Sequence, residues 1–377
     1  MNVREILSGR TLALGIGLFL GLAALPATAG GVGDNGALTL RRQDAGVTRV
    51  RGYWTPERLR AARPLPLNHV QAADADVLDE PEAAASTLAA EAPASAPGQR
   101  PLPEIRPLLS NRLFEESEVE SPRPVAGRAA GSAGGHFTSH RLIPADADLE
   151  FPYRTVGIVL FTVPGEGDFY CTGTVLRRRL VVTAGQCLHQ GSGGNDGFFE
   201  NFLFVPAYRD GVAPYSTWEW SAVTVPTTWS TGNGRLPNAA DYGFLEVEDQ
   251  VYNGSLRKVG DVVGFLGYVI KKLRPNHGTL LGYPTNFDEG ELMHQVSAKD
   301  LRAAAQNTVE FGSDMRGGSA GGPILQDFGD NANTVKLIGV ISYGSTAATV
   351  KTQGASIPDN RFTSLLNSAC ADRAGNC

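Results

Sequence analysis

The stretch GSDMRGGSAGGPIL, residues 312–325, carries most of the information about the fold and function of this chain. Four glycines surround the small residue Ala320, and packing alone does not explain such a run. Glycine tolerates φ > 0 and close approach of the backbone to a ligand, so the run predicts a loop whose N–H groups point at a bound group. A buried strand, LIGVISYG at residues 337–344, follows it.

A second pair of segments lies upstream. CTGTV (171–175) and LVVTAGQC (180–187) flank a turn of three arginines, which predicts two half-buried strands joined as a hairpin. The hairpin would bring Cys171 and Cys187 close enough to bridge. A disulfide there would stabilise the fold by about 3 kcal/mol on the loop-entropy model.

The cysteine count agrees with an exported protein. Cys171, Cys187, Cys370 and Cys377 are the four cysteines of the chain. An even number in an exported chain predicts two disulfides, and four cysteines allow three connectivities. The alternative, a metal site, is disfavoured because there is no C-x-x-C pair and His189 is the only histidine near a cysteine. We therefore expect no metal and no cofactor.

The first 29 residues have the pattern of a signal peptide. Arg4 and Arg10 precede an apolar run at residues 11–25, and Ala27-Thr28-Ala29 offers a small-x-small cleavage site. An uncleaved anchor is the alternative, but the run is short for a membrane span, and no later segment is long and apolar enough. We expect a secreted or periplasmic protein with no membrane contact after cleavage, and the sequence does not separate the two compartments.

Composition divides the rest of the chain. The net charge of −6 and pI of about 5.6 give no reason to expect nucleic-acid or anionic-membrane partners. Residues 30–140 are rich in Ala and Pro and predict a largely disordered leader or pro-segment. Within it, Trp54 and Leu59 could dock on a folded domain. Residues 141–377 form the predicted domain.

The sequence pattern of this domain is typical of an all-β fold. Short β-rich runs are separated by Gly, Pro, Asn and Asp turns, which favours one barrel or a pair of barrels. Two short helices are expected, at residues 301–306 and 361–368. The clearest strands are residues 156–163, 172–182, 201–205, 242–247, 262–266 and 336–343.

The ordered set of motifs resembles the trypsin-like serine peptidases, and most of all their bacterial glutamyl-endopeptidase-like branch. The resemblance implies two six-stranded antiparallel β-barrels of the chymotrypsin type with a cleft between them. It spans roughly residues 150–365. The matching pieces are FPYR (151–154), CTGT (171–174), TAGxC (183–187), FVPAY (204–208), DYG (241–243), GYP (282–284), GGSxGGP (317–323) and ISYG (341–344).

The resemblance also places the catalytic triad, and two of its positions are substituted. Gln186 stands where the family has the histidine base, and Ala320 stands where it has the serine nucleophile. Asp241 matches the aspartate that orients the histidine. An amide does not titrate near neutral pH and a methyl group has no nucleophilic oxygen. In one serine protease, loss of the nucleophile or base costs about 2 × 10⁶ in kcat. We therefore predict an inactive pseudo-peptidase.

Other parts of the family's site are retained. The resemblance assigns the oxyanion hole to the N–H groups of Gly318 and Ala320, which need no side chain. It assigns substrate binding to Ser342, Tyr343 and Gly344, a strand edge that can pair with a peptide backbone. Asp314 matches an aspartate of the pocket loop.

Members that cleave after Glu use a pocket histidine. His277 and His294 are the candidates here.

Three functions remain open from the sequence. The first is a secreted binding protein, a monomer with a peptide or protein ligand in the cleft between the barrels. The second is an active serine endopeptidase that uses Ser319 as a shifted nucleophile and His189 as a non-standard base. The third is a structural surface module. For Asp241 we favour a structural role, accepting hydrogen bonds from the Gln186 amide and nearby backbone.

Overall fold

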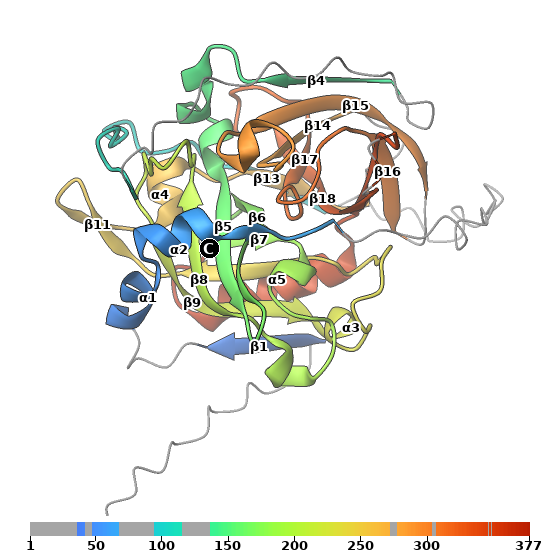
Figure 1. The fold of residues 1–377 in the computed structure, drawn as a ribbon, viewed down its shortest axis with the longest axis horizontal. Helices are drawn as coiled ribbons and strands as arrows, with labels where there is room; N and C mark the ends of the chain where they lie inside the picture. Colours follow the sequence, from blue (N-terminus) through green and yellow to red (C-terminus); the bar gives the residue numbers. More distant parts are fainter. Residues whose placement is uncertain are drawn as a thin grey trace, which may run out of the picture.

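In the computed structural model, the described residues are 36–41, 47–67, 94–114, 136–271, 277–303, 307–345, 347 and 349–377. The predicted signal peptide lies outside these residues. Two closed barrels, each of six antiparallel strands, make up most of the described chain (Figure 1). The predicted fold class is confirmed. Among the described residues, no helix is long and apolar enough to cross a membrane.

The first barrel closes in the order β5-β6-β7-β10-β9-β8, with β8 paired back to β5. Its interior is aromatic: Phe161, Phe202 and Trp218 are fully buried, and Phe161 stacks on Phe199 with ring centroids 5.4 Å apart. The strands are β5 (Val156–Val163), β6 (Gly167–Val175), β7 (Leu180–Thr183), β8 (Glu200–Pro206), β9 (Trp218–Pro226) and β10 (Gly243–Val247).

The second barrel closes in the order β14-β15-β16-β19-β18-β17, with β17 paired back to β14. Its interior is mainly aliphatic. A short parallel strand, β13 (Gly267–Val269), adds to β18. The six strands are β14 (His277–Gly282), β15 (His294–Ala303), β16 (Thr308–Gly312), β17 (Pro323–Gln326), β18 (Lys336–Gly344) and β19 (Thr352–Ser356).

A C-terminal helix, α5 (Asn360–Asp372), packs on the first barrel and on β13. Asp359 caps it by accepting hydrogen bonds from the N–H groups of Arg361 and Phe362. Phe362 is fully buried, with its ring 5.2 Å from that of Tyr242. The expected terminal helix is confirmed. The other expected helix is wrong where it can be compared, because residues 301–303 continue β15, and residues 304–306 lie outside the described chain.

Shorter elements connect these strands. β11 (Gln250–Tyr252) and β12 (Ser255–Arg257) form a hairpin, and α3 (Thr227–Ser230) and α4 (Val259–Val263) are single turns of helix. Two disulfides are present: Cys171–Cys187 joins β6 to the turn after β7, and Cys370–Cys377 ties α5 to the last residue. The predicted pair of disulfides is confirmed.

Parts of the predicted leader are folded onto the barrels. β1 (Ala37–Arg41) extends the first sheet beside β9, and β2 (Arg63–Pro64) runs parallel to β6. β3 (Ser95–Ala96) pairs with β13, and β4 (Phe137–Arg141) pairs with β15. These stretches of the predicted leader are ordered, because sheet edges satisfy their backbone groups. Other parts of the leader, for which disorder is predicted, lie outside the described residues.

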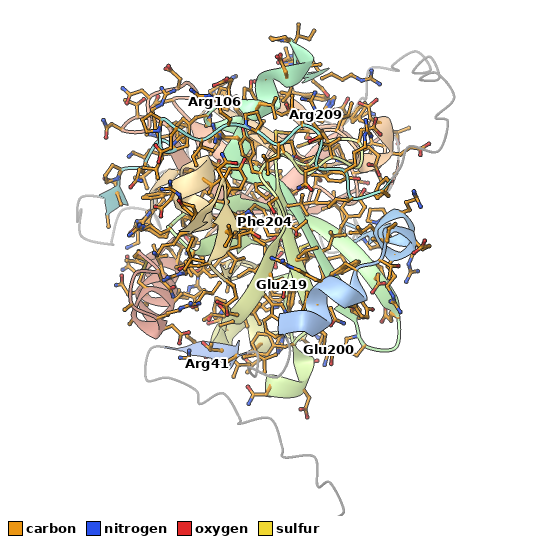
Figure 2. The ribbon with its side chains drawn as sticks, turned by 90° about the vertical axis from the view of Figure 1, so that its left-hand side faces the viewer. Arg41, Arg106, Glu200, Phe204, Arg209 and Glu219 are labelled. Carbon is orange, nitrogen blue, oxygen red and sulfur yellow. A yellow bond between two sulfur atoms is a disulfide. The ribbon has the colours of Figure 1, made fainter. Side chains whose placement is uncertain are left out.

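Two short helices of the leader, α1 (Val47–Tyr53) and α2 (Pro56–Ala61), lie against the first barrel (Figure 2). Trp54 lies between them and is only 5% exposed, and its Nε1 donates to the Asn201 carbonyl at 2.6 Å. Arg51 pairs with the buried Glu219 at 2.7 Å. The expected docking of Trp54 is confirmed, and Leu59 is partly buried against the same core.

Candidate functional site between the two barrels

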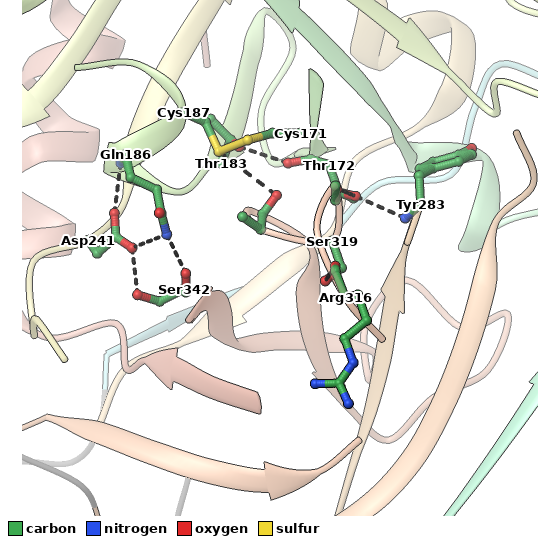
Figure 3. Close-up of a disulfide and its surroundings, with 12 residues drawn as sticks. Cys171, Thr172, Thr183, Gln186, Cys187, Asp241, Tyr283, Arg316, Ser319 and Ser342 are labelled. Carbon is green, nitrogen blue, oxygen red and sulfur yellow. Dashed lines mark hydrogen bonds between the residues drawn. A yellow bond between two sulfur atoms is a disulfide. The ribbon is translucent and has the colours of Figure 1, made fainter. Parts of the chain in front are cut away.

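The glycine-rich loop of the second barrel lies directly against the disulfide-bearing hairpin of the first (Figure 3). The Thr172 N–H donates to the Ala320 carbonyl at 2.8 Å, and Thr172 Oγ1 donates to the Gly318 carbonyl at 2.9 Å. Thr183 Oγ1 donates to the Thr172 carbonyl at 2.7 Å. These bonds fix the loop at residues 317–322 relative to both strands of the hairpin.

Gly321 makes this close contact possible. Its φ is +83°, and a Cβ there would lie 2.0 Å from Thr183 Oγ1 and 2.2 Å from the Thr172 carbonyl oxygen. Both distances are far inside van der Waals contact. The glycine at this position is therefore required by the packing of one barrel on the other.

Gln186, Asp241 and Ser342 form one buried hydrogen-bonded group (Figure 3). Gln186 lies in a single 3-10 turn, Gly185–Cys187, directly after β7. Its backbone N–H donates to Asp241 Oδ1 at 2.8 Å, and its Nε2 donates to Oδ2 at 3.0 Å and to the Ser342 carbonyl oxygen. Ser342 Oγ also donates to Asp241 Oδ2, at 2.5 Å. The expected hydrogen bonds from Gln186 to Asp241 are confirmed.

Asp241 has no exposed surface. Burial raises the pKa of its carboxyl group to about 6, against the opposing effect of the hydrogen bonds from Ser342 and Gln186. Hydrogen-bond donors therefore stabilise the charge of this carboxylate, and neither Gln186 nor Ser342 is a cation.

Ala320 and Gly318 lie next to this group. The Ala320 carbonyl oxygen is 3.9 Å from Cys187 Sγ, so the segments that carry Ala320 and Gln186 are adjacent. The Ala320 side chain is fully buried. Gly318 has φ +88°, and its N–H donates to the carbonyl of Leu65, a leader residue, at 3.1 Å.

The proposed substitute nucleophile and base are not brought together. Ser319 is fully buried, and its Oγ donates to the Arg316 carbonyl at 2.6 Å and accepts from Gln353 Nε2 at 2.7 Å. His189 is also fully buried; one ring nitrogen lies 2.7 Å from the Gly194 carbonyl and the other accepts from the Gly191 N–H. Neither side chain has a hydrogen bond to the other: Ser319 is bonded to its own loop and to β19, and His189 to the loop that follows it.

The expected pocket residues are buried. Asp314 is 4% exposed, and its backbone carbonyl accepts from Asn286 Nδ2 at 2.9 Å. Tyr343 pairs with Gly354 of β19, and its ring lies where a Cβ on Gly354 would be. Gly344 lies beside the Leu67 side chain.

The two histidine candidates lie on β14 and β15. His277 is exposed at the start of β14. His294 is buried, hydrogen-bonded to Ser139 of β4 at 2.7 Å and stacked on Phe287.

Sequence reasoning missed two side chains of this site and one backbone carbonyl, that of Leu65. Ser342 was expected to act through its backbone, yet its hydroxyl binds Asp241. Arg316 donates to the carbonyls of Ala347 and Val350 at 3.0 and 2.9 Å, and so holds the loop after β18. Leu65 gave no signal, because only the folded leader places it at the glycine-rich loop.

No model of a known protein family matches this chain. A glutamyl endopeptidase of Bacillus licheniformis is 24% identical over 226 residues, covering 59% of this chain and 63% of the relative. A Bacillus subtilis protein described as an extracellular metalloprotease is 24% identical over 192 residues, covering 50% of this chain and 56% of the relative. The chain thus spans less than two thirds of either relative.

Two solved proteases match nearly their whole length. The protease Anisep of Arthrobacter nicotinovorans is 29% identical, with a TM-score of 0.50, covering 58% of this chain and 96% of that structure. The thermostable serine protease AL20 is 25% identical, with a TM-score of 0.51, covering 58% of this chain and 98% of that structure. The chain is a homologue of the trypsin-like serine proteases. Within this serine protease homologue, the described residues contain no group of three or more His, Cys, Asp or Glu placed to hold a metal ion.

The contact between Gly321 and the hairpin yields a stability prediction. Gly321→Ala adds a Cβ at positive φ into two oxygen atoms, so we expect a loss of about 3 kcal/mol in the free energy of unfolding. Gly329→Ala is the matched control, since its Cβ would have no neighbour closer than 4.0 Å, and we expect a change within about 0.5 kcal/mol. Urea unfolding of both variants measures this. Equal effects would show that the barrels are not in contact at Gly321.

Burial of Asp241 makes stability depend on pH. An aspartate has a pKa near 3.9 in an unfolded chain, and the folded protein raises the pKa of Asp241 to about 6. The resulting contribution to the free energy of unfolding is complete below pH 4 and is lost as the pH rises through 6. Asn cannot titrate. The unfolding free energy of the wild-type protein minus that of Asp241→Asn should therefore fall by on the order of 3 kcal/mol between pH 4 and pH 7. A constant or rising difference would contradict the raised pKa.

Proposed function

We propose that this protein is a secreted, non-catalytic homologue of serine proteases whose inter-barrel cleft binds an extended peptide. One observation supports it above the others: the Gln186 amide is hydrogen-bonded to Asp241 and Ser342 at the position matched to the base, beside a methyl group at Ala320.

The chemistry at these two positions supports inactivity. Acyl transfer requires an oxygen that attacks the carbonyl carbon and a base that takes its proton and returns it to the leaving amine. Gln186 Nε2 is a donor to two acceptors and has no lone pair for a proton. Ala320 supplies no oxygen. The oxyanion hole and substrate binding alone accelerate the reaction by about 10³–10⁴-fold over the reaction in water, and this rate enhancement is negligible for hydrolysis of a peptide bond.

The same geometry supports binding. The Gly318 N–H already holds a peptide carbonyl, and the loop around it is shaped by contacts with the first barrel rather than by the missing catalytic groups. The Ser342 carbonyl is engaged by Gln186. A ligand strand would therefore form its backbone hydrogen bonds with other groups of the cleft, such as the Gly318 N–H.

Secretion is supported by the two disulfides and by a curated relative described as extracellular. It also agrees with the pattern of residues 1–29. We propose a peptide or protein as the ligand and a monomer as the binding unit.

The rival function is an active serine endopeptidase, and it is favoured by the relatives, which are described as proteases. It needs Ser319 and His189 to act together. Their hydrogen bonds to separate loops count against that.

A fluorophosphonate probe distinguishes these two functions. We expect no labelling of the purified protein, and no hydrolysis of casein, under conditions that label trypsin completely. Ser319→Ala is the matched control and should behave as the wild-type protein does. Labelling of any serine would overturn the proposed function, and its loss in Ser319→Ala would identify the nucleophile.

A further inference from the structure

We infer that the cleft binds a segment of the protein's own leader, residues 63–67 (Arg-Pro-Leu-Pro-Leu), with the Leu65 carbonyl in the position where a scissile carbonyl would be held. This inference rests on the proposed function, since it names the ligand of the same cleft. In Figure 1 the segment is the blue trace after α2, which crosses from β6 toward the second barrel.

Backbone hydrogen bonds connect this segment to both barrels. β2 pairs in parallel with Phe169 and Tyr170 of β6, and the Leu65 N–H donates to the Tyr170 carbonyl at 2.9 Å. On its other side, the Leu65 carbonyl accepts from the Gly318 N–H at 3.1 Å. One residue therefore bridges the first barrel and the glycine-rich loop of the second.

The glycines of the loop and of β18 leave room for this segment. A Cβ on Gly317 would lie 3.1 Å from the Leu65 carbonyl oxygen, and a Cβ on Gly344 would lie 3.0 Å from Leu67 Cδ1. Leu67 is 3% exposed, so its side chain is buried at the strand edge that the sequence assigned to substrate. The segment thus occupies both ends of the expected binding surface.

The composition of the segment suits an extended ligand. Pro64 and Pro66 have φ fixed near −65°, which lowers the entropy lost on binding, and they have no N–H to leave unpaired. Pro64 and Pro66 alternate with Leu65 and Leu67, so a backbone donor recurs at every second residue. The Leu65 N–H uses Tyr170 and not Ser342, which leaves the Ser342 carbonyl to Gln186.

Arg63 and residues before the segment hold it on the first barrel. Arg58 and Tyr53 both bind the Asp168 carboxylate, at 2.8 and 2.6 Å. The Arg63 guanidinium donates to the Glu166 carbonyl at 2.6 Å and lies over the Phe169 ring. Anchoring of this kind gives an intrachain ligand an effective concentration on the order of millimolar. A peptide supplied in solution then competes only when the leader segment is weakened.

Hydrogen exchange at Gly318 tests the occupancy in the full chain. Leu67→Asp places a charge in a buried apolar contact, so we expect the Gly318 amide to exchange at least about tenfold faster. Ala61→Asp is the matched control, with the same charge at an exposed position of α2, and should leave the rate unchanged. Arg63→Ala removes only exposed anchoring contacts and should also raise the rate, which covers the case that Leu67→Asp fails to fold. Unchanged exchange in folded Leu67→Asp or in Arg63→Ala would overturn the inference.

A second arm uses a fluorescein-labelled peptide of residues 61–67. By anisotropy, Leu67→Asp should bind it with a Kd below about 1 mM, and the wild-type protein and Ala61→Asp should bind at least about tenfold more weakly. Equal binding to all three would overturn the inference. Fluorophosphonate labelling of the wild-type protein would contradict the proposed function but not this inference, because hydrogen exchange and anisotropy do not depend on catalysis.

Discussion

The buried carboxylate of Asp241 constrains this site more than any other group. It has no exposed surface and lies between the barrels, so its charge must be met by donors within hydrogen-bonding reach. Gln186 of the first barrel supplies two N–H groups and Ser342 of the second supplies a hydroxyl. A glutamine at position 186 therefore keeps the donors that the carboxylate requires while providing no base. In the proposed non-catalytic protein, this glutamine therefore leaves the hydrogen bonding of the buried carboxylate complete.

The glycine-rich loop meets a second constraint, because both the first barrel and the leader pack against it. Gly321 allows the first barrel to approach, Gly318 presents its N–H at positive φ, and Gly317 leaves space for the leader. These requirements are geometric and do not depend on a nucleophile. They explain how a complete set of loop glycines persists around Ala320, and they make a binding role physically coherent.

Much of this could be predicted from sequence because the informative signals were local. Short strands separated by turns predicted one barrel or a pair, and the resemblance to the trypsin-like peptidases implied two. The hairpin around Arg177–Arg179 predicted the Cys171–Cys187 bridge. Docking of Trp54 could be predicted, but the strands of the leader could not, because their order depends on pairing with sheet edges that are distant in sequence. The Ser342 hydroxyl was missed for the same reason, since its partner is distant in sequence. Residues 301–303 extend β15 because pairing with β16 outweighs a weak helical pattern.

We propose that an intact protease scaffold lacks two catalytic side chains and that its own leader covers the cleft. The most direct test is the rate of peptide hydrolysis by Gln186→His/Ala320→Ser with and without Leu67→Asp. We predict measurable hydrolysis by the triple variant, clearly slower hydrolysis by the double variant, and none by Leu67→Asp alone. Hydrolysis by Leu67→Asp alone, or an inert but folded triple variant, would contradict it.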